Sequence, residues 1–390
     1  VRGTSDNGSA VYTFTMPDRD TDISAYISAT EQPTVTFNGN GKTTATIIVD
    51  GSEKASGQKV FPGSMVEVSV KPGTNYYNPT LTVSGASFSD TGTQTYTQRT
   101  YRFQMGTDNV TLIGAATDNP KITYTGTDKA TADNAINGRQ VRPGTAVSFK
   151  LAATADYYWP TATSGDTVLT EVSVKKDSDY ATGSYSFIMP EKSVKITGTA
   201  IANPTVTYEG GSRAAVSGFT SGGKIRPGTV VNFKLTATAD YYWPTASSTD
   251  VGLAEISVKK TTDYESGSYK FTMPTKAVKI SGTAIDNPTV TISKGANVSS
   301  ATVSATKARP GTEITVEVVG THTESKSWFG STCTFRTPAA VATGATLKKT
   351  AETGGTYDSL GKIIYNVVEK KITYTCKLGT SSVVVTTSAS

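Results

Sequence analysis

The sequence predicts an all-β protein made of tandem modules of about 84 residues each. Three observations support this class. Charged residues make up only 18% of the chain, whereas Gly, Thr, Ser, Val and Tyr are abundant, which favours strands and turns over helices. Apolar residues recur with period two. The same short motifs return along all 390 residues, so several copies of one unit are expected.

The repeat is clearest in the middle of the chain. The segments 120–203 and 204–287 align without a gap and are identical at about 49 positions. Related openings, "QPTVTF", "NPKITY", "NPTVTY" and "NPTVTI", place a proline at four almost evenly spaced positions, Pro33, Pro120, Pro204 and Pro288. We therefore divide the chain into residues 1–31, the closing hairpin of an incomplete module, and modules 1 to 4 at 32–118, 119–202, 203–286 and 287–390.

Each module shows the alternation of half-buried strands. After the turn "RPGT", Val147, Phe149 and Leu151 alternate with polar residues, so one face of this strand should be buried. In the closing segment, Tyr185 and the apolar residues that follow it continue through a short turn to Val194, a pattern typical of an antiparallel hairpin. Six to eight short strands per module fit an immunoglobulin-like β-sandwich, and a β-grasp-like repeat is the alternative.

The closing segments of modules 2 and 3 share one motif. "YSFIMPEKSVKI" and "YKFTMPTKAVKI" follow the pattern aromatic-x-Phe-x-Met-Pro-x-x-x-Val-x-Ile. This pattern resembles tandem β repeats of secreted and cell-surface proteins of Gram-positive bacteria, which often act as stalks, adhesin bodies or surface-layer components. The resemblance implies an extracellular location on the bacterial cell surface. The chain contains no apolar stretch long enough to cross a bilayer as a helix, so no membrane span is expected in this segment.

Few residues offer catalytic or metal-binding chemistry. The single histidine, His322, excludes sites built from several histidines. Asp18, Asp20 and Asp22 have a spacing that could ligate calcium, but the matching places in other copies read as ordinary turns. The net charge of +5 is spread along the chain without a dense basic run, so nucleic acid is not an implied partner. We expect no enzyme and no cofactor.

The string "ATADYYWPTA" occurs twice, unchanged, and provides two aromatic triplets. As stacking platforms for sugar rings they would make the protein a carbohydrate-binding adhesin. As structural elements they would close one end of a sandwich or pack against the next module. Module 1 keeps Tyr76 and Tyr77 but has Asn78 in place of tryptophan, which favours the structural interpretation. The candidate residues are Tyr157, Tyr158, Trp159, Tyr241, Tyr242 and Trp243.

Cys333 and Cys376 both lie in module 4. In an exported protein, two cysteines confined to one module are most simply explained by a disulfide, and two buried thiols are the alternative.

Residues 1–31 contain "VYTFTMPDRDTDISAYIS", a closing hairpin whose opening strands lie outside this sequence. Alone it would expose a core face. It therefore either docks on another chain or on a further segment of the same chain, or it belongs to a truncated module. Head-to-tail exchange between copies would build filaments. The sequence thus predicts a non-catalytic structural rod, stalk, filament or surface-layer subunit. A carbohydrate-binding adhesin that contacts glycans or a host surface is the alternative.

Overall fold

A computed structural model describes residues 2–6, 9–20, 22–24, 31–92, 94–133, 136–173, 179–257 and 263–390. The chain divides into two compact units, Val1–Ile201 and Ala202–Ser390. All regular secondary structure in the described ranges is β-strand, which confirms the predicted all-β class. No helix long and apolar enough to cross a membrane occurs in these ranges.

The first strands of unit 1 form a hairpin that differs from the predicted one. β1 (Arg2–Asp6) pairs antiparallel with β2 (Ser9–Thr13), so that Thr13 lies opposite Arg2. The prediction paired residues 11–16 with a strand further along the chain. Residues 14–20 and 22–24 form no strand, and residues 21 and 25–30 of the predicted partner lie outside the described ranges.

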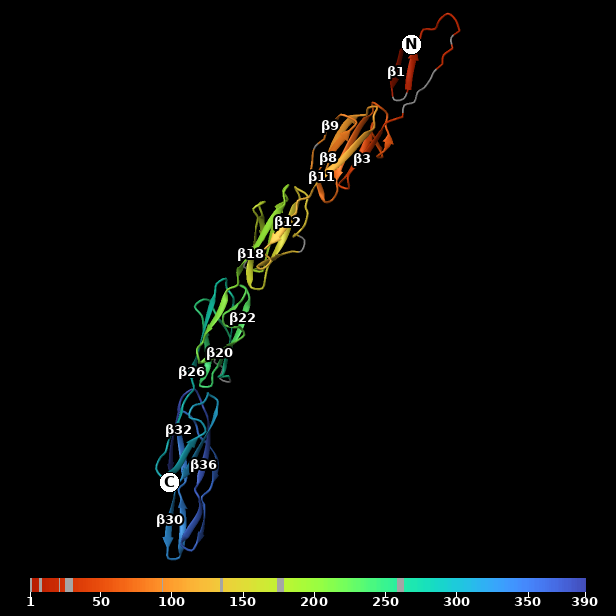
Figure 1. The fold of residues 1–390 in the computed structure, drawn as a ribbon. Coiled ribbons are helices and arrows are strands. Elements are labelled where there is room, and N and C mark those ends of the chain that lie inside the picture. Colours follow the sequence, from red (N-terminus) through yellow and green to blue (C-terminus); the bar gives the residue numbers. More distant parts are fainter. Residues whose placement is uncertain are drawn as a thin grey trace. The chain divides into compact units, whose positions relative to one another are not determined.

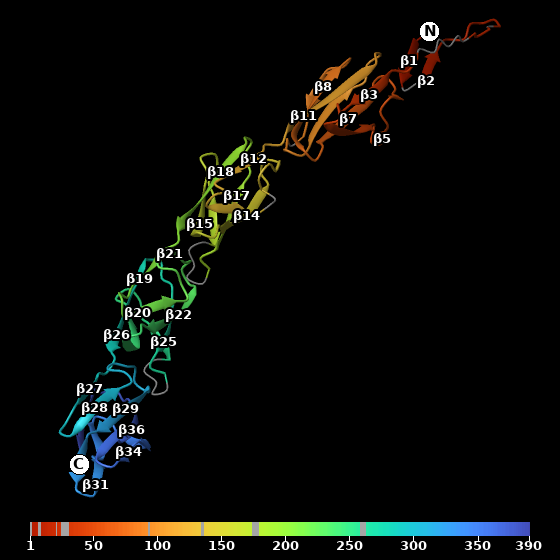
Figure 2. The same ribbon diagram turned by 60° about the horizontal axis from the view of Figure 1, so that its bottom comes forward.

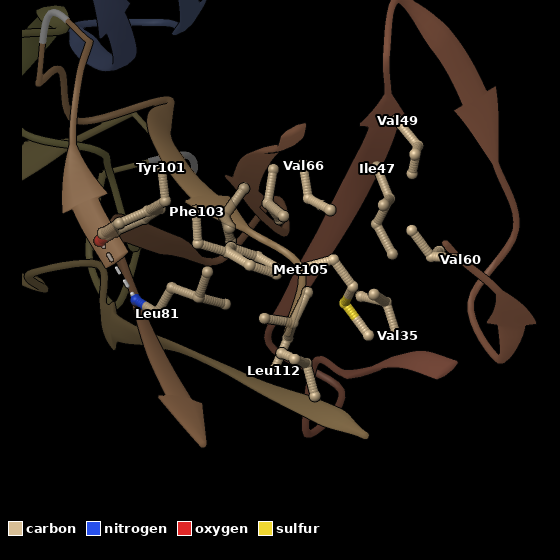
Figure 3. Close-up of a cluster of buried hydrophobic side chains, with 13 residues drawn as sticks. Val35, Ile47, Val49, Val60, Val66, Leu81, Tyr101, Phe103, Met105 and Leu112 are labelled. Carbon is tan, nitrogen blue, oxygen red and sulfur yellow. Dashed lines mark hydrogen bonds between the residues drawn. The ribbon is translucent and has the colours of Figure 1, made fainter. Parts of the chain in front are cut away.

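Module 1 is a sandwich of two sheets with a valine-rich core. One sheet has the order β5-β4-β7-β10-β9 and the other the order β6-β3-β11-β8. Figure 3 shows side chains from both sheets meeting between them, and the Tyr101 hydroxyl accepts a hydrogen bond from the Leu81 backbone N–H at 3.2 Å. The strands are β3 (Thr34–Asn38), β4 (Thr43–Val49), β5 (Ser52–Lys54), β6 (Gln58–Lys59), β7 (Met65–Pro72), β8 (Tyr76–Ser84), β9 (Phe88–Asp90), β10 (Arg99–Gln104) and β11 (Val110–Asp118).

Module 2 repeats this plan with sheets β12-β18-β15 and β13-β14-β17-β16. Val147, Phe149 and Leu151 are buried while Ser148 and Lys150 are exposed, as their alternation predicts. The strands are β12 (Ile122–Thr125), β13 (Ala130–Ala132), β14 (Ala146–Ala153), β15 (Tyr157–Thr163), β16 (Thr170–Ser173), β17 (Thr182–Ile188) and β18 (Val194–Ala202).

Module 3, in unit 2, has the sheets β21-β19-β26-β23 and β20-β22-β25-β24. Its core uses the same positions as the core of module 2, with Phe233, Tyr269 and Met273 at the places of Phe149, Tyr185 and Met189. The strands are β19 (Thr205–Glu209), β20 (Ala214–Ser217), β21 (Gly223–Lys224), β22 (Val230–Ala237), β23 (Tyr241–Ser247), β24 (Ala254–Ser257), β25 (Ser266–Thr272) and β26 (Val278–Asp286).

Module 4 keeps two sheets, β27-β37-β32 and β28-β29-β36-β33, and adds the separate hairpins β30–β31 and β34–β35. Figure 1 labels β30, β32 and β36 in this blue part of the chain. The strands are β27 (Val290–Ser293), β28 (Val298–Val303), β29 (Glu313–Gly320), β30 (His322–Ser327), β31 (Gly330–Phe335), β32 (Pro338–Thr343), β33 (Lys348–Thr353), β34 (Thr356–Leu360), β35 (Ile363–Val368), β36 (Lys371–Lys377) and β37 (Val383–Ala389).

The first and last strands of every module pair in parallel, through β3–β11, β12–β18, β19–β26 and β27–β37. In module 2 this pairing needs a glycine. A Cβ built on Gly198 would lie 1.9 Å from the Tyr124 hydroxyl, which donates a hydrogen bond to the Ala130 carbonyl at 2.7 Å. Gly282 has the same relationship to Tyr208 in module 3. The absence of a side chain on the last strand thus makes room for the ring of the first.

The predicted closing hairpin of each module is wrong. β17 pairs with β14 and β16, whereas β18 pairs with β12 and β15 in the opposite sheet. Residues 189–193 therefore carry the chain from one sheet to the other. Both strands place alternate apolar residues in the same core, Tyr185 and Phe187 from one side and Val194 from the other. A hairpin and a crossing between sheets produce the same period of two, so the pattern alone could not separate them.

Candidate functional site

The repeated aromatic string lies where a loop enters β15 in module 2 and β23 in module 3. Tyr158 and Tyr242 are 5% and 4% exposed, whereas their neighbours Tyr157, Trp159, Tyr241 and Trp243 are half-buried. Burial raises the pKa of both inner tyrosines, and a second tyrosine near each ring raises it further. The inner tyrosines are therefore part of the protein's interior.

The two tryptophans occupy an unusual backbone conformation. Trp159 and Trp243 have φ of 47° and 46°, in the left-handed region that bulky residues rarely adopt. Each indole stacks on a tyrosine at 5.3 Å between ring centroids, Trp159 on Tyr180 and Trp243 on Tyr264. Asn78 stands at the same place in module 1 with φ of 52°. Asparagine tolerates this conformation well, which explains the exchange in physical terms.

The polar edge of each indole is turned inward. The Nε1 atoms of Trp159 and Trp243 are buried and have no hydrogen-bond acceptor among the described residues. A tryptophan that binds a sugar usually offers an open ring face and an accessible polar edge. Here Tyr180 and Tyr264 stack on the indoles, and Nε1 is inaccessible, so the geometry is that of a packed structural element.

In unit 1, the matching string of module 1 forms the junction with module 2. Arg142, from the turn that precedes β14, donates from Nε to the Tyr76 carbonyl at 3.2 Å and from Nη2 to the Gly73 carbonyl at 3.2 Å. The Tyr77 hydroxyl donates to the Glu191 carbonyl at 3.2 Å. Two segments that lie far apart in the sequence of module 2 thus contact module 1. They are the Arg-Pro-Gly turn and the turn after Met189.

The side chain of Tyr96 also contacts module 2 at this junction. Its hydroxyl donates to Oε1 of Glu191 at 2.6 Å, and this hydrogen bond raises the pKa of Tyr96. The ring meets that of Tyr77 edge to face, with 5.9 Å between centroids. It also lies against Gly144, where a Cβ would be 3.6 Å from the ring. A single acidic residue, Glu191, therefore contacts both Tyr77 and Tyr96 of module 1.

In unit 2, module 3 and module 4 meet through the corresponding atoms. Arg309 donates from Nε to the Tyr241 carbonyl at 3.2 Å and from Nη2 to the Thr238 and Ala237 carbonyls at 3.3 Å. The Tyr242 hydroxyl donates to the Thr380 carbonyl at 3.4 Å, after the residues Leu378 and Gly379 that replace the Met-Pro pair.

Charges support this second junction. The Arg309 guanidinium lies 3.5 Å from the Glu265 carboxylate. Two cations, Arg213 from module 3 and Lys307 from module 4, lie 5.0 and 5.8 Å from the centroid of the Tyr241 ring. These interactions are partly exposed and individually weak, so the buried Tyr242 and the arginine–carbonyl bonds dominate the junction.

The sequence pattern did not single out the arginines Arg142 and Arg309 or the matching tyrosines Tyr96, Tyr180 and Tyr264. The turn "RPGT" predicts only the start of a strand. Its arginine recurs as Arg142, Arg226 and Arg309, and module 1 has Phe61 instead. The recurrence of arginine in three copies was the available signal, but the acceptors of Arg142 and Arg309 are backbone carbonyls of another module, which carry no sequence signature.

The predicted disulfide is not formed. Cys333 and Cys376 are both free thiols. Cys376 is buried on β36 opposite Ile314, within the main core, whereas Cys333 lies on β31 opposite Glu324, in a hairpin that forms its own sheet. Two cysteines confined to one module therefore fall in different sheets, and the alternative of free thiols describes the structure.

The calcium candidates are not gathered into a site. Asp18, Asp20 and Asp22 are exposed and lie outside any strand. Over the described ranges, no group of three or more His, Cys, Asp or Glu side chains could hold a metal ion. His322 lies 3.4 Å through Nδ1 from Oε1 of Glu369 and packs near Phe335. These contacts connect His322 on β30 with β31 and with the residue that follows β35.

No protein-family model matches the chain, and no curated protein sequence matches it significantly.

Proposed function

We propose that this chain is a non-catalytic structural repeat protein of the bacterial cell surface, which forms a rod, stalk, filament or surface-layer subunit. The observation that carries the proposal is the reuse of one junction. Arg142 and Arg309 bind equivalent carbonyls of the preceding module, and Tyr77 and Tyr242 donate to equivalent carbonyls of the following one. The repeated aromatic string therefore joins modules, as a load-carrying array requires.

The proposed location at the cell surface rests on the repeat pattern. The motif that ends in Met-Pro places Phe187 and Met189 in the core of module 2, where they are 4% and 1% exposed. The resemblance to repeats of Gram-positive surface proteins thus rests on residues whose role is structural. It supports extracellular display without identifying a ligand.

Assembly between copies is supported by the first segment. In "YTFTMP", Tyr12, Phe14 and Met16 are 67%, 43% and 68% exposed, although the same motif is buried in modules 2 and 3. These side chains have the composition of a core strand without the sheets that would cover them. We infer that they dock against strands supplied by a second copy or by another part of the same protein.

The carbohydrate-binding alternative needs an accessible aromatic platform. Trp159 and Trp243 would have to release their tyrosine partners and turn Nε1 outward. Binding of soluble glycans that protects neither tryptophan from chemical modification would argue against a role for these residues in adhesion.

Negative-stain electron microscopy of the full chain, beside a chain without residues 1–31, tests the proposal. We expect filaments that disappear with the deletion, and isolated rods from the shortened chain. Filaments from both chains would show that the first segment is not the assembly element. Flexible, bead-like particles from both would contradict the structural role.

A further inference from the structure

Module 4 differs from module 3 at one end of its sandwich. Module 3 passes from β22 to β23 through residues 238–240, and from β24 to β25 through residues 258–265. At the corresponding places module 4 has residues 321–337, which include the hairpin β30–β31, and residues 354–370, which include β34–β35. This is the end at which Tyr241 of module 3 receives Arg309. Module 4 has its two added hairpins at this end, where module 3 has Tyr241 and Tyr242.

The turns of the two hairpins meet at their tips. Trp328 and Phe329 form the turn of β30–β31 and are 86% and 97% exposed. Lys362, in the turn of β34–β35, places its Nζ 5.1 Å from the centroid of the Trp328 ring. Leu360 and Ile363, on either side of that turn, are 73% and 64% exposed. Figure 2 shows β31 and β34 close together at this end of the module. We call Trp328, Phe329, Leu360 and Ile363 the aromatic tip.

The second hairpin has apolar residues on both faces. Along β35, Ile363, Tyr365 and Val368 are exposed, while Ile364 and Val367 are half-buried. A strand with one face in water normally alternates apolar and polar residues, as β14 does. The composition of β35 is suited to surroundings that are apolar on more than one side.

The positive charge of the protein is concentrated in this module. Residues 287–390 contain 11 lysines and arginines against 6 aspartates and glutamates, and the rest of the chain has 26 of each. Module 4 thus carries the whole formal excess of +5. Lys326 and Lys362 flank the aromatic tip. The acidic residues of the two hairpins are Glu324 on β30 and Asp358 on β34, and Asp358 accepts a hydrogen bond from Asn366 at 3.0 Å.

We propose that the aromatic tip inserts into the surface of an anionic lipid bilayer. Tryptophan and phenylalanine partition into the headgroup and upper acyl region, while lysines beside them contact anionic headgroups. The tip is formed by two protruding turns, and a bilayer accepts such a convex apolar group without a complementary pocket. A protein groove would have to match both turns in shape. The inference does not depend on the structural role proposed above, because it concerns what module 4 contacts.

Vesicle binding by the full chain tests this assignment. We expect co-sedimentation with vesicles that mix phosphatidylglycerol and phosphatidylcholine, and much weaker binding to phosphatidylcholine alone. The variant W328S/F329S should bind the anionic vesicles at least roughly tenfold more weakly, because it removes the largest apolar groups of the tip. The variant K326E/K362E should lose the preference for anionic vesicles. V341S is the matched control, since Val341 is 71% exposed in the same module but lies on β32.

A second measurement separates insertion from loose adsorption. Lipids with brominated acyl chains should quench part of the tryptophan fluorescence of the wild type and of V341S, and this component should be missing from W328S/F329S. L360S/I363S provides an independent pair of substitutions on the other hairpin and should also weaken binding. Absence of binding to anionic vesicles, or equal binding by wild type and W328S/F329S, would overturn the proposal. Self-association that depends on Trp328 without any vesicle binding would assign the tip to a protein contact and would also overturn it.

Discussion

The Nε atom of Arg309 lies 3.2 Å from the carbonyl oxygen of Tyr241, in the preceding module. Arg142 makes the same contact with Tyr76. The acceptors are backbone atoms at the start of a strand. The arginine therefore fixes both the position of that strand end and its distance from the following module. The junction therefore joins side chains of one sandwich to main-chain carbonyls of the other, and side-chain variation such as Asn78 on the accepting segment does not remove the acceptor.

Replacement of Arg309 should loosen this junction. The variant R309M keeps the aliphatic stem but loses three hydrogen bonds to carbonyls and the contact with Glu265. We expect the contact between modules 3 and 4 to be destabilised by about 2 kcal/mol, since hydrogen bonds from a charged donor are stronger than neutral ones. Amide hydrogen exchange of the full chain should become faster near residues 237–242. R102M, which alters an exposed arginine paired with Glu67, should leave these amides unchanged.

Substitutions of Trp243 should separate backbone strain from ring packing. W243N places at φ of 46° a residue that tolerates this conformation, as Asn78 does in module 1, but it loses the stack on Tyr264. We expect it to destabilise module 3 by about 1 kcal/mol. W243V loses the same stack and forces a β-branched residue into the left-handed region, which should raise the cost to about 3 kcal/mol. Urea unfolding of the full chain measures both; equal costs would contradict the role of φ.

The alternation of β14 was predictable because strand geometry places every second residue on the same face. Val147, Phe149 and Leu151 show this directly. The partner of each strand was not predictable. β17 and β18 look like a hairpin in sequence, yet they lie in different sheets, since both sheets contribute alternate residues to one core.

The same limit applies to the candidate site. The inner tyrosines, Tyr158 and Tyr242, are the buried members of each triplet, in line with the alternation of side chains along a strand. The positive φ of Trp159 leaves no mark in the sequence except Asn78 at the matching position. Arg142 in a Pro-Gly turn looks like a solvated charge until the preceding module is placed beside it.

A methyl group at Gly198 should disrupt the pairing of the first and last strands of module 2. The variant G198A places a Cβ within 1.9 Å of the Tyr124 hydroxyl, so the ring must move and its bond to Ala130 must weaken. We expect a loss of about 2 kcal/mol, the usual cost of overpacking. The control G165A is in the same module, where a Cβ meets no described atom within 4 Å. Calorimetry should show a lower Tm for G198A but not for G165A. The double variant G198A/Y124L should recover part of the lost Tm.

Glu352 should make module 4 sensitive to strong acid. Hydrogen bonds from Lys349 and Lys370 lower the pKa of this carboxyl from 4.5 to about 2. Its folded pKa lies below the unfolded value, so its stabilising contribution is complete above about pH 4.5 and is lost as the pH falls through 2. Thermal unfolding from pH 6 to pH 2 should show E352Q less stable than wild type at the upper end and equal to it at the lower end. A difference that persists unchanged at pH 2 would contradict this assignment.

The two cysteines should titrate as free thiols of unequal reactivity. Burial raises the pKa of both, with Glu324 adding to the effect at Cys333 and Glu313 at Cys376. Because the thiolate is the reactive form, alkylation at neutral pH should be slow for both residues. Cys333 is half-exposed and should react first, whereas buried Cys376 should react only when module 4 opens. Denatured protein that was never reduced should release two thiols. A count of zero thiols would show that the disulfide forms. Equal alkylation rates of the folded variants C333S and C376S would show that Cys376 is more accessible than its place in the core allows.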